Sequence, residues 1–380
     1  MLTVGFILLA IGLFQLFGDI SSIPGDYPLY SYGLILLTIG AILIPFTVLK
    51  IKSISLPAVE PVLRSPAIGF NPTIVFPVLL FIWGVLLLSG YLLADQEILS
   101  TLIMPIVSIL GVIVPILVYV SISLHKAEPL ALSRKWGVIS SGMTLSPILA
   151  TLLELGILVI VLVFIIIVIM QDSSLMSDLQ ITATRLANGQ ENPEVINNIL
   201  SAFISRPVNR FLIFSIVSGL IPIIEEVVKQ IPLWLLSWRK LTPRAGFLVG
   251  ALSGAGFALF EGLMATSSLS GSEQWLFLMF GRAGASMMHV LTGAIGGWGL
   301  ASAIQGRSYM KAVLAYITCI FIHGAWNAMA TWEGISRLVS MSASATFHFS
   351  KASLIPLVLM GVLFLFMLVF LIKNNKIIKD

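Results

Sequence analysis

The stretch IPIIEEVVKQIPLW, residues 221–234, places two adjacent carboxylates and an ammonium in an otherwise apolar segment. The charged residues are Glu225, Glu226 and Lys229. In water such a helix would need no explanation, but in hydrocarbon each unpaired charge costs roughly 2.5–3.5 kcal/mol even on the mildest scale. The solvent around this segment therefore decides both the fold and the role of its charges.

The composition indicates that the solvent is a lipid bilayer. Of the 380 residues, 58% are hydrophobic and 10% are charged, and the mean hydropathy is +1.05. A typical soluble domain has about 25% charged residues. The sequence therefore predicts an all-α, polytopic bundle of transmembrane helices.

Apolar runs of about 20 residues, the length that crosses a bilayer, recur along the chain. Hydropathy and flanking charge predict about ten spans, at residues 2–18, 30–49, 74–94, 98–124, 141–170, 211–237, 247–265, 275–304, 312–332 and 353–372. The first run lacks a basic segment and a small-residue cleavage site, so we interpret it as a span and not as a signal peptide.

The charges of the connecting loops predict the orientation of the spans. Lys and Arg gather in every second loop, around residues 50–64, 126–135, 239–244 and 307–311, and in the tail from residue 373. Because basic loops stay in the cytoplasm, we expect both termini to be cytoplasmic. This distribution accounts for most of the net charge of +4, so no nucleic-acid partner is needed. Cys319 is the only cysteine, which excludes disulfides within the chain.

Ionisable and strongly polar residues gather in four consecutive spans, the sixth to the ninth. They are Glu225, Glu226 and Lys229, then Glu261, then Arg282 and His289, then His323 and Asn327. Such groups are best satisfied in a membrane when they face one another around a shared, hydrated cavity. We therefore expect these four helices to surround one polar site.

Residue spacing supports this expectation. Arg282, Ser286 and His289 follow a spacing of four and then three, which gives the eighth span one polar stripe. Pro222 and Pro232 lie on either side of the carboxylate pair and are expected to bend the helix there. Small residues recur at every fourth position of the seventh span, a pattern typical of close helix packing, at Gly246, Gly250, Gly254, Ala258 and Gly262.

Carboxylates and imidazoles around water are typical of general acid–base hydrolysis. A His and an Asn on one helix face can also donate to an oxyanion. The sequence contains neither a Gly-x-Ser-x-Gly elbow nor the zinc motif His-Glu-x-x-His. Zinc nevertheless accepts three His or Glu ligands and a water, so a metal site stays open at this point.

Three motifs carry a resemblance to a known family. EEVVK at 225–229, FALFE at 257–261 and HGAWN at 323–327 resemble the Glu-Glu-x-x-Lys, Phe-x-x-x-Glu and His-x-x-x-Asn/Asp motifs of the PrsW family. These are bacterial intramembrane proteases related to the CAAX prenyl endopeptidases and to Abi proteins. His289 lies where that family usually has another histidine. The resemblance covers roughly residues 211–332.

The resemblance implies an endopeptidase that cleaves membrane-anchored proteins with water activated by a glutamate. Glu225 would be the general base with Glu226 beside it, and Glu261 would hold or polarise the water. His323 and Asn327 would form the oxyanion site. Lys229 would set the charge balance, and we interpret Arg282 as a structural partner of Glu261. We expect no cofactor; in a zinc-dependent version the ligands would be Glu225, Glu261, His289 and His323.

The predicted spans, together with the resemblance over 211–332, suggest how the chain is organised. Residues 1–140 would form an N-terminal transmembrane region of four spans with no assigned role. Residues 141–210 would hold the fifth span and a long extracytoplasmic loop, 211–332 the catalytic core, and 333–380 the last span with a basic cytoplasmic tail. The family implies a multi-pass protein of a bacterial or archaeal plasma membrane.

Two other functions remain open at this stage. Carboxylates and histidines near the middle of a membrane also build proton relays, so a proton-coupled transporter or channel is the main alternative. Against it, the polar residues cluster in one third of the chain and no inverted repeat is evident. The family domain could also be a scaffold that binds membrane proteins without cleaving them.

Overall fold

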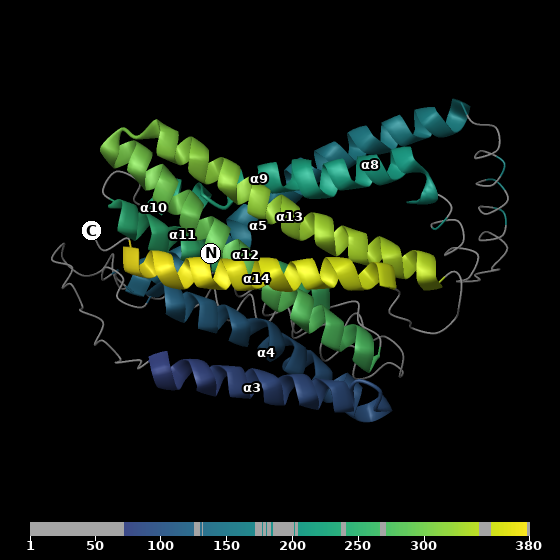
Figure 1. Ribbon diagram of the computed structural model, residues 1–380, viewed down its shortest axis with the longest axis horizontal. Coiled ribbons are helices and arrows are strands. Elements are labelled where there is room, and N and C mark those ends of the chain that lie inside the picture. The colour runs from purple at the N-terminus through teal and green to yellow at the C-terminus, as the bar shows by residue number, and fades with distance from the viewer. Residues whose placement is uncertain are drawn as a thin grey trace, which may run out of the picture. The chain divides into compact units, whose positions relative to one another are not determined.

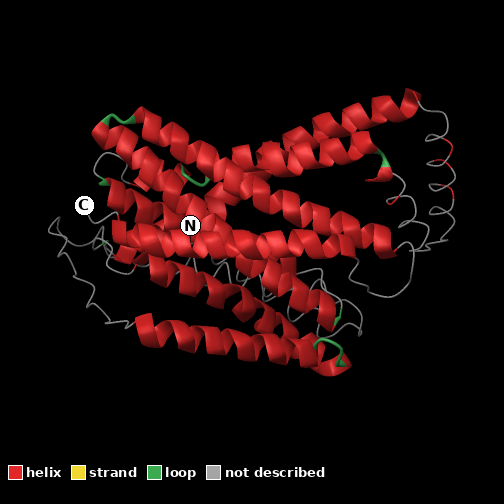
Figure 2. Ribbon diagram, viewed as in Figure 1, coloured by secondary structure: helices red, strands yellow, loops and turns green. Residues whose placement is uncertain are grey.

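The computed structural model describes residues 72–124, 130, 132–171, 204–236, 241–266, 271–341 and 351–377, and four isolated helical positions between 177 and 201. Every regular element within these residues is a helix (Figure 2), which confirms the all-α prediction for this part of the chain. The first two predicted spans, at 2–18 and 30–49, and most of the loop at 171–210 lie outside the described residues.

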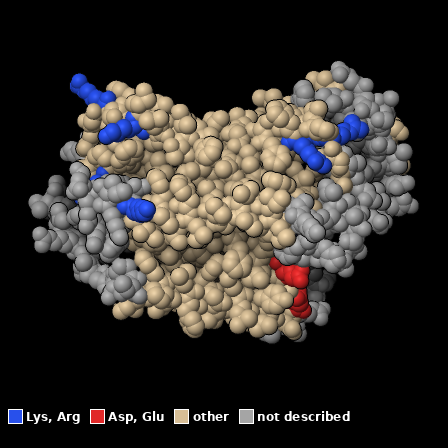
Figure 3. All heavy atoms as spheres, viewed as in Figure 1, with Lys and Arg blue, Asp and Glu red and all other residues tan. Residues whose placement is uncertain are grey.

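Eight helices in the described part are long and apolar enough to cross a membrane. They match the third to the tenth predicted spans and lie at Ile74–Leu93, Ile103–Leu124, Arg134–Val161, Pro207–Trp234, Pro243–Ala265, Ser272–Gly306, Tyr309–Leu338 and Leu354–Lys373. Few charged side chains appear on the described surface in Figure 3. The chain is therefore a multi-pass membrane protein, as its composition predicts.

The helices are labelled in Figure 1. Their bounds are α3 Pro72–Leu93, α4 Glu97–Leu124, α5 Leu132–Gln171, α8 Pro207–Ser215, the π-helical η1 Ile216–Leu220, α9 Ile221–Val228, α10 Ile231–Leu236, α11 Pro243–Ala265, α12 Ser272–Gly306, α13 Tyr309–Met341 and α14 Lys351–Ile377. The chain divides into two compact units. The first contains α3, α4, α10, α11 and α12, with α5 up to Pro147, α9 from Glu225, α13 up to His323 and α14 from Val362.

The pair α11 and α12 forms the centre of the first unit, because these two helices share its most extensive contact. Glycines let their backbones touch: a Cβ added at Gly250 would lie 2.0 Å from the Gly293 carbonyl oxygen, and one added at Gly293 would lie 2.4 Å from that of Gly250. Three members of the predicted small-residue ladder of the seventh span, Gly246, Gly250 and Gly254, thus contact α12, whereas Gly262 faces Val112 of α4.

The hairpin of α3 and α4 packs against the first half of α12. The two helices run side by side in Figure 1. The indole of Trp275, on α12, is buried against Gly90 and donates to the Ser108 hydroxyl at 2.8 Å. Asp95, in the turn between α3 and α4, accepts the backbone N–H of Ser272 at 3.1 Å. The third and fourth spans therefore hold α12 from its N-terminal end.

The sixth predicted span is not a continuous α-helix. The π-helical turn Ile216–Leu220 comes directly before Pro222, and a two-residue turn at 229–230 separates α9 from α10, in which Pro232 is the second residue. Proline lacks an N–H, so each one removes a helical hydrogen bond to the carbonyl four residues earlier. The interruptions occur next to the two prolines at which the sequence predicts bends.

Candidate active site

Glu226, near the end of α9, and Lys229, in the turn that directly follows, face each other within the first unit. Their spacing of three places both side chains on one helix face, and the Lys229 ammonium donates to Glu226 Oε1 at 2.5 Å. It also lies 3.8 Å from Glu225 Oε2 and 5.0 Å from the centre of the Phe257 ring. Lys229 is fully buried, so this charge is satisfied by the protein alone.

Glu226 Oε1 binds donors from three different helices. Besides Lys229, it accepts the Thr292 hydroxyl of α12 at 3.1 Å and lies 2.7 Å from Nδ1 of His323 on α13. The Lys229 ammonium also lies near this Nδ1, at 3.5 Å, but the carboxylate is the closer neighbour. Because an ionised carboxylate only accepts hydrogen bonds, we assign the proton to Nδ1. The lone pair of His323 is therefore on Nε2, which lies 3.6 Å from Glu225 Oε2.

His289, on α12, also has one ring nitrogen hydrogen-bonded to a carboxylate. Its Nε2 lies 2.7 Å from Glu261 Oε2 of α11, and the same oxygen accepts Arg282 Nη2 at 2.9 Å. The predicted partnership of Arg282 with Glu261 agrees with this contact. Nε2 of His289 donates to the carboxylate, so the lone pair is on Nδ1. That nitrogen is buried and has no hydrogen-bond partner among the described residues.

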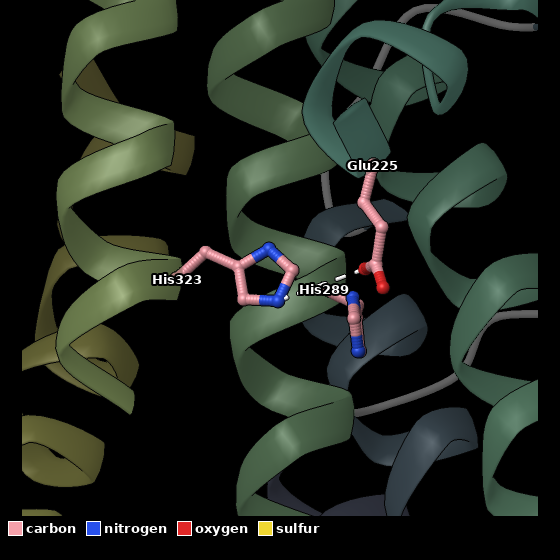
Figure 4. Close-up of side chains that lie close together, drawn as sticks. All are labelled: Glu225, His289 and His323. Atoms are coloured by element: carbon pink, nitrogen blue, oxygen red, sulfur yellow. Dashed lines mark ion pairs between the residues drawn. The ribbon is translucent and has the colours of Figure 1, made fainter. Parts of the chain in front are cut away.

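Glu225, His289 and His323 come together as one cluster, although they lie on three different helices (Figure 4). One ligand atom from each lies within 4.8 Å of the others. The three residues are 5%, 1% and 1% exposed. This confirms the predicted convergence of the sixth, eighth and ninth spans on one buried polar site.

The charges around the cluster are unequal when all three carboxylates are ionised. Three carboxylates, those of Glu225, Glu226 and Glu261, surround it together with the cations Lys229 and Arg282. With both imidazoles neutral, one net negative charge is then left. Removing such a charge from water is costly, so the site would be neutralised by a proton on a carboxylate or by a bound cation.

The donor set fits a zinc ion. Two histidines and one glutamate, with a fourth position for water, are a known catalytic zinc arrangement. Histidines that bind zinc usually donate their other ring nitrogen to a carboxylate or carbonyl. Glu226 and Glu261 fill that role here. Three of the four predicted ligands, Glu225, His289 and His323, are therefore candidate ligands among the described residues. The fourth, Glu261, instead contacts Nε2 of His289, the ring nitrogen that is not available as a ligand.

Asn327 belongs to the second unit, which contains the rest of α5, α8, η1, α13 from Gly324 and the start of α14. Its side-chain amide donates to the Val217 carbonyl of the π-helical turn at 3.0 Å. In the same unit, Gly324 lies against the Ser218 carbonyl, where an added Cβ would be 2.4 Å from the oxygen. The predicted oxyanion role of Asn327 stays a prediction, since an amide has a second N–H.

A comparison with protein families agrees with this geometry. The model of the PrsW family intramembrane metalloprotease matches residues 145–372, more than half of the chain. The chain belongs to the PrsW family. Membership supports an intramembrane peptidase that acts on membrane proteins within the lipid bilayer. No curated protein and no solved structure matches the chain.

The PrsW match is wider than the motifs suggest. It begins inside α5 and ends in α14, whereas the sequence resemblance covers 211–332. Every member of the cluster lies within it, and so do Glu226, Lys229, Glu261 and Arg282. Helices α3 and α4 lie before it, although they pack against α12 in the same unit.

Sequence reasoning missed two residues that contact the charged PrsW motif. Thr292 donates to Glu226, and Ser253 donates to the Lys229 carbonyl. Thr292 lies three residues after His289, so it continues the polar stripe of α12, and this spacing is a signal that could have identified it. Ser253 has no comparable signal, because its partner is a backbone carbonyl that a regular helix would satisfy itself.

Proposed function

We propose that this PrsW-family chain hydrolyses peptide bonds of membrane-anchored proteins at the cluster of Glu225, His289 and His323, with a divalent metal ion, most simply zinc, held there. The observation that carries the proposal is the buried pair of imidazoles, each with one ring nitrogen on a carboxylate and the other directed to the shared cluster. Zinc at such a site would polarise the scissile carbonyl and make water more acidic.

The residues around the cluster orient the imidazoles. Glu226 holds the proton of His323 on Nδ1, and Glu261 holds that of His289 on Nε2. The lone pairs on Nε2 of His323 and Nδ1 of His289 are then available as ligands. In this arrangement His323 serves as a ligand and not as an oxyanion donor, which differs from the role implied by the sequence resemblance.

Glu225 is the residue we assign to proton transfer. A carboxylate has two oxygens, so one can act as a ligand while the other accepts the proton of the attacking water. Glu225 then returns that proton to the amine that leaves when the peptide bond breaks. Lys229, held by Glu226, lies 3.8 Å from Glu225 Oε2, where its positive charge would stabilise the developing negative charge. Arg282 is held by Glu261 and serves as its structural partner.

Cleavage of a membrane-anchored reporter tests the proposal. We expect the wild-type protein to release a fragment and Glu225→Gln to release none, since the amide can neither accept the proton nor act as an anionic ligand. New protein termini, compared by mass spectrometry between membranes that carry either form, would identify natural substrates.

A matched control is Glu333→Gln. Glu333 is also a buried carboxylate, but it pairs with Arg337 inside the second unit. This variant should keep its activity, provided that both variants insert equally well. Full cleavage by Glu225→Gln would contradict the assignment of the site.

A further inference from the structure

The turn between α9 and α10 takes the Lys229 backbone carbonyl out of the helical hydrogen-bond pattern. In a regular helix the Leu233 N–H would donate to the Lys229 carbonyl. It donates instead to the carbonyl of Gln230 at 3.0 Å. The Lys229 carbonyl lies in the protein interior, where an unsatisfied acceptor is costly, so it needs another donor.

Ser253 supplies that donor from α11. Its hydroxyl donates to the Lys229 carbonyl at 2.6 Å, and both residues are fully buried. Phe257, one turn further along the same helix, places its ring 5.0 Å from the Lys229 ammonium. Helix α11 therefore holds Lys229 at both its backbone and its charged end, with residues four apart on one face.

Thr292 supplies the corresponding contact from α12. Its hydroxyl donates to Glu226 Oε1 at 3.1 Å, and the residue is fully buried. The backbone carbonyl of Thr292 in turn accepts the Cys319 thiol of α13 at 3.1 Å. The backbone of Thr292 is thus bonded to the same helix that carries His323, the imidazole oriented by Glu226.

We propose that Ser253 and Thr292 are positioning residues of the peptidase: together they fix the non-helical turn at 229–230 and the Glu226 carboxylate, which in turn orients His323. The functional part of this inference rests on the function proposed above. Neither residue belongs to the charged motifs, and neither is placed in contact with the substrate. Thr292 acts through Glu226, which orients His323, and Ser253 acts through the turn that carries Lys229.

The sharpest test is Thr292→Val, which keeps the shape of the side chain and removes the hydroxyl. Glu226 Oε1 then loses one of its three donors, and both the carboxylate and His323 become less fixed. Loss of partners that orient metal ligands typically lowers metal affinity or activity about 10–100-fold. Because Thr292 contacts Glu226 and not a ligand itself, we expect kcat and zinc affinity to fall by about 10-fold, the lower end of that range, with KM little changed and with activity kept in Thr292→Ser.

A double-mutant cycle separates positioning from a general loss of packing. If Thr292 acts through Glu226, Thr292→Val should not lower the zinc affinity of a Glu226→Gln protein any further. Effects that multiply would overturn the proposal, and so would a Thr292→Val protein with unchanged kcat and zinc affinity. Ser302→Ala is the matched control, because this buried hydroxyl of α12 bonds only within its own helix, to the Trp298 carbonyl at 2.8 Å.

Ser253→Ala tests the other contact. The Lys229 carbonyl would lose its donor, so we expect a lower unfolding midpoint in detergent together with a reduced kcat. An unchanged midpoint and kcat would overturn the role of Ser253.

A measurement that needs no activity distinguishes failure of this inference from failure of the proposed function. The side-chain ¹⁵N signals of His323 in the purified protein report which ring nitrogen carries the proton. The wild type should show a single Nδ1–H form, and Thr292→Val a mixture of forms. A single unchanged form in the variant would overturn the positioning role, whether or not the wild type cleaves a reporter or binds zinc.

Discussion

Glu261 shows how a residue at the edge of the site contributes to its centre. Its side chain is 30% exposed, whereas the imidazole it supports is fully buried. One carboxylate oxygen receives both His289 and Arg282. The sequence motif predicts a functional glutamate at this position, and only the contacts show that it bonds the imidazole from the side opposite the cluster.

We expect Glu261→Gln to lower the rate of cleavage and the zinc affinity about 10–100-fold without abolishing either. The amide removes the negative charge that holds the His289 proton on Nε2, and it leaves Arg282 without its ion pair. Reporter cleavage and zinc competition titration would measure the effect. A loss as complete as that of Glu225→Gln would instead indicate that Glu261 is a ligand or the general base.

At the scale of single residues, intramembrane charge was a reliable signal. Glu225, Glu226, Lys229, His289 and His323 stand out in the sequence because ionisable groups in lipid are rare, and the structure brings them together. Hydroxyls carry no such signal, since serine and threonine also occur in membrane helices as simple packing residues. The position of Thr292 on the polar stripe of α12 could have been noticed from its spacing, but its contact with Glu226, and the contact of Ser253 with the Lys229 carbonyl, could not be predicted from the sequence.

At the scale of helices, the separation of α11 and α12 sets the position of Glu261 relative to His289. The glycines at their crossing leave no room for a side chain, because a Cβ at Gly250 would lie 2.0 Å from the Gly293 carbonyl oxygen. Close approach of this kind is typical of small-residue contacts between membrane helices. The site therefore depends on a contact that contains no catalytic group.

Gly250→Ala should force the two helices apart and destabilise the protein by roughly 1–3 kcal/mol, the usual cost of overpacking. Gly84→Ala is the matched control, since an added Cβ there meets nothing within 4 Å. That variant should be as stable as the wild type or slightly more so, because alanine has the higher helix propensity. Equal thermal midpoints in detergent for the two variants would show that the glycine contact is not tight.

The sixth span shows what element-level prediction achieves and what it misses. Two prolines in the sequence predict interruptions, and the structure has them next to both prolines. The kind of interruption was not predictable, because a π-helical turn at one and a short non-helical turn at the other depend on partners from other helices. Ser253 provides such a partner for the second.

At the scale of the whole molecule, a bound metal ion would stabilise the folded state. The candidate ligands come from three helices, so an ion that binds them opposes the separation of these helices. A ligand that binds only the native state at 100 times its dissociation constant adds about 2.7 kcal/mol of stability. Metal binding should therefore be visible in the unfolding of the full chain.

We expect added zinc to raise the thermal midpoint of the chelated wild-type protein and to restore its lost peptidase activity. The Glu225→Gln protein should show neither effect. Differential scanning fluorimetry in detergent, together with reporter cleavage after treatment with a strong chelator, would measure both. Full activity after exhaustive chelation, with no change of the thermal midpoint on adding zinc, would contradict the metal site and favour a metal-free mechanism with a glutamate as general base.

The sequence by itself determined that the protein spans a membrane, where most of its spans lie and which four of them carry the charged groups. These properties depend on hydropathy and on charge in lipid, which are local to each segment. Tertiary structure decided which carboxylate supports which imidazole, that Glu261 lies behind His289, and that the Asn327 amide donates to Val217. The reason is that these contacts depend on the rotation and spacing of helices far apart in the chain, which are set by glycine contacts and buried hydroxyls with no distinctive local pattern.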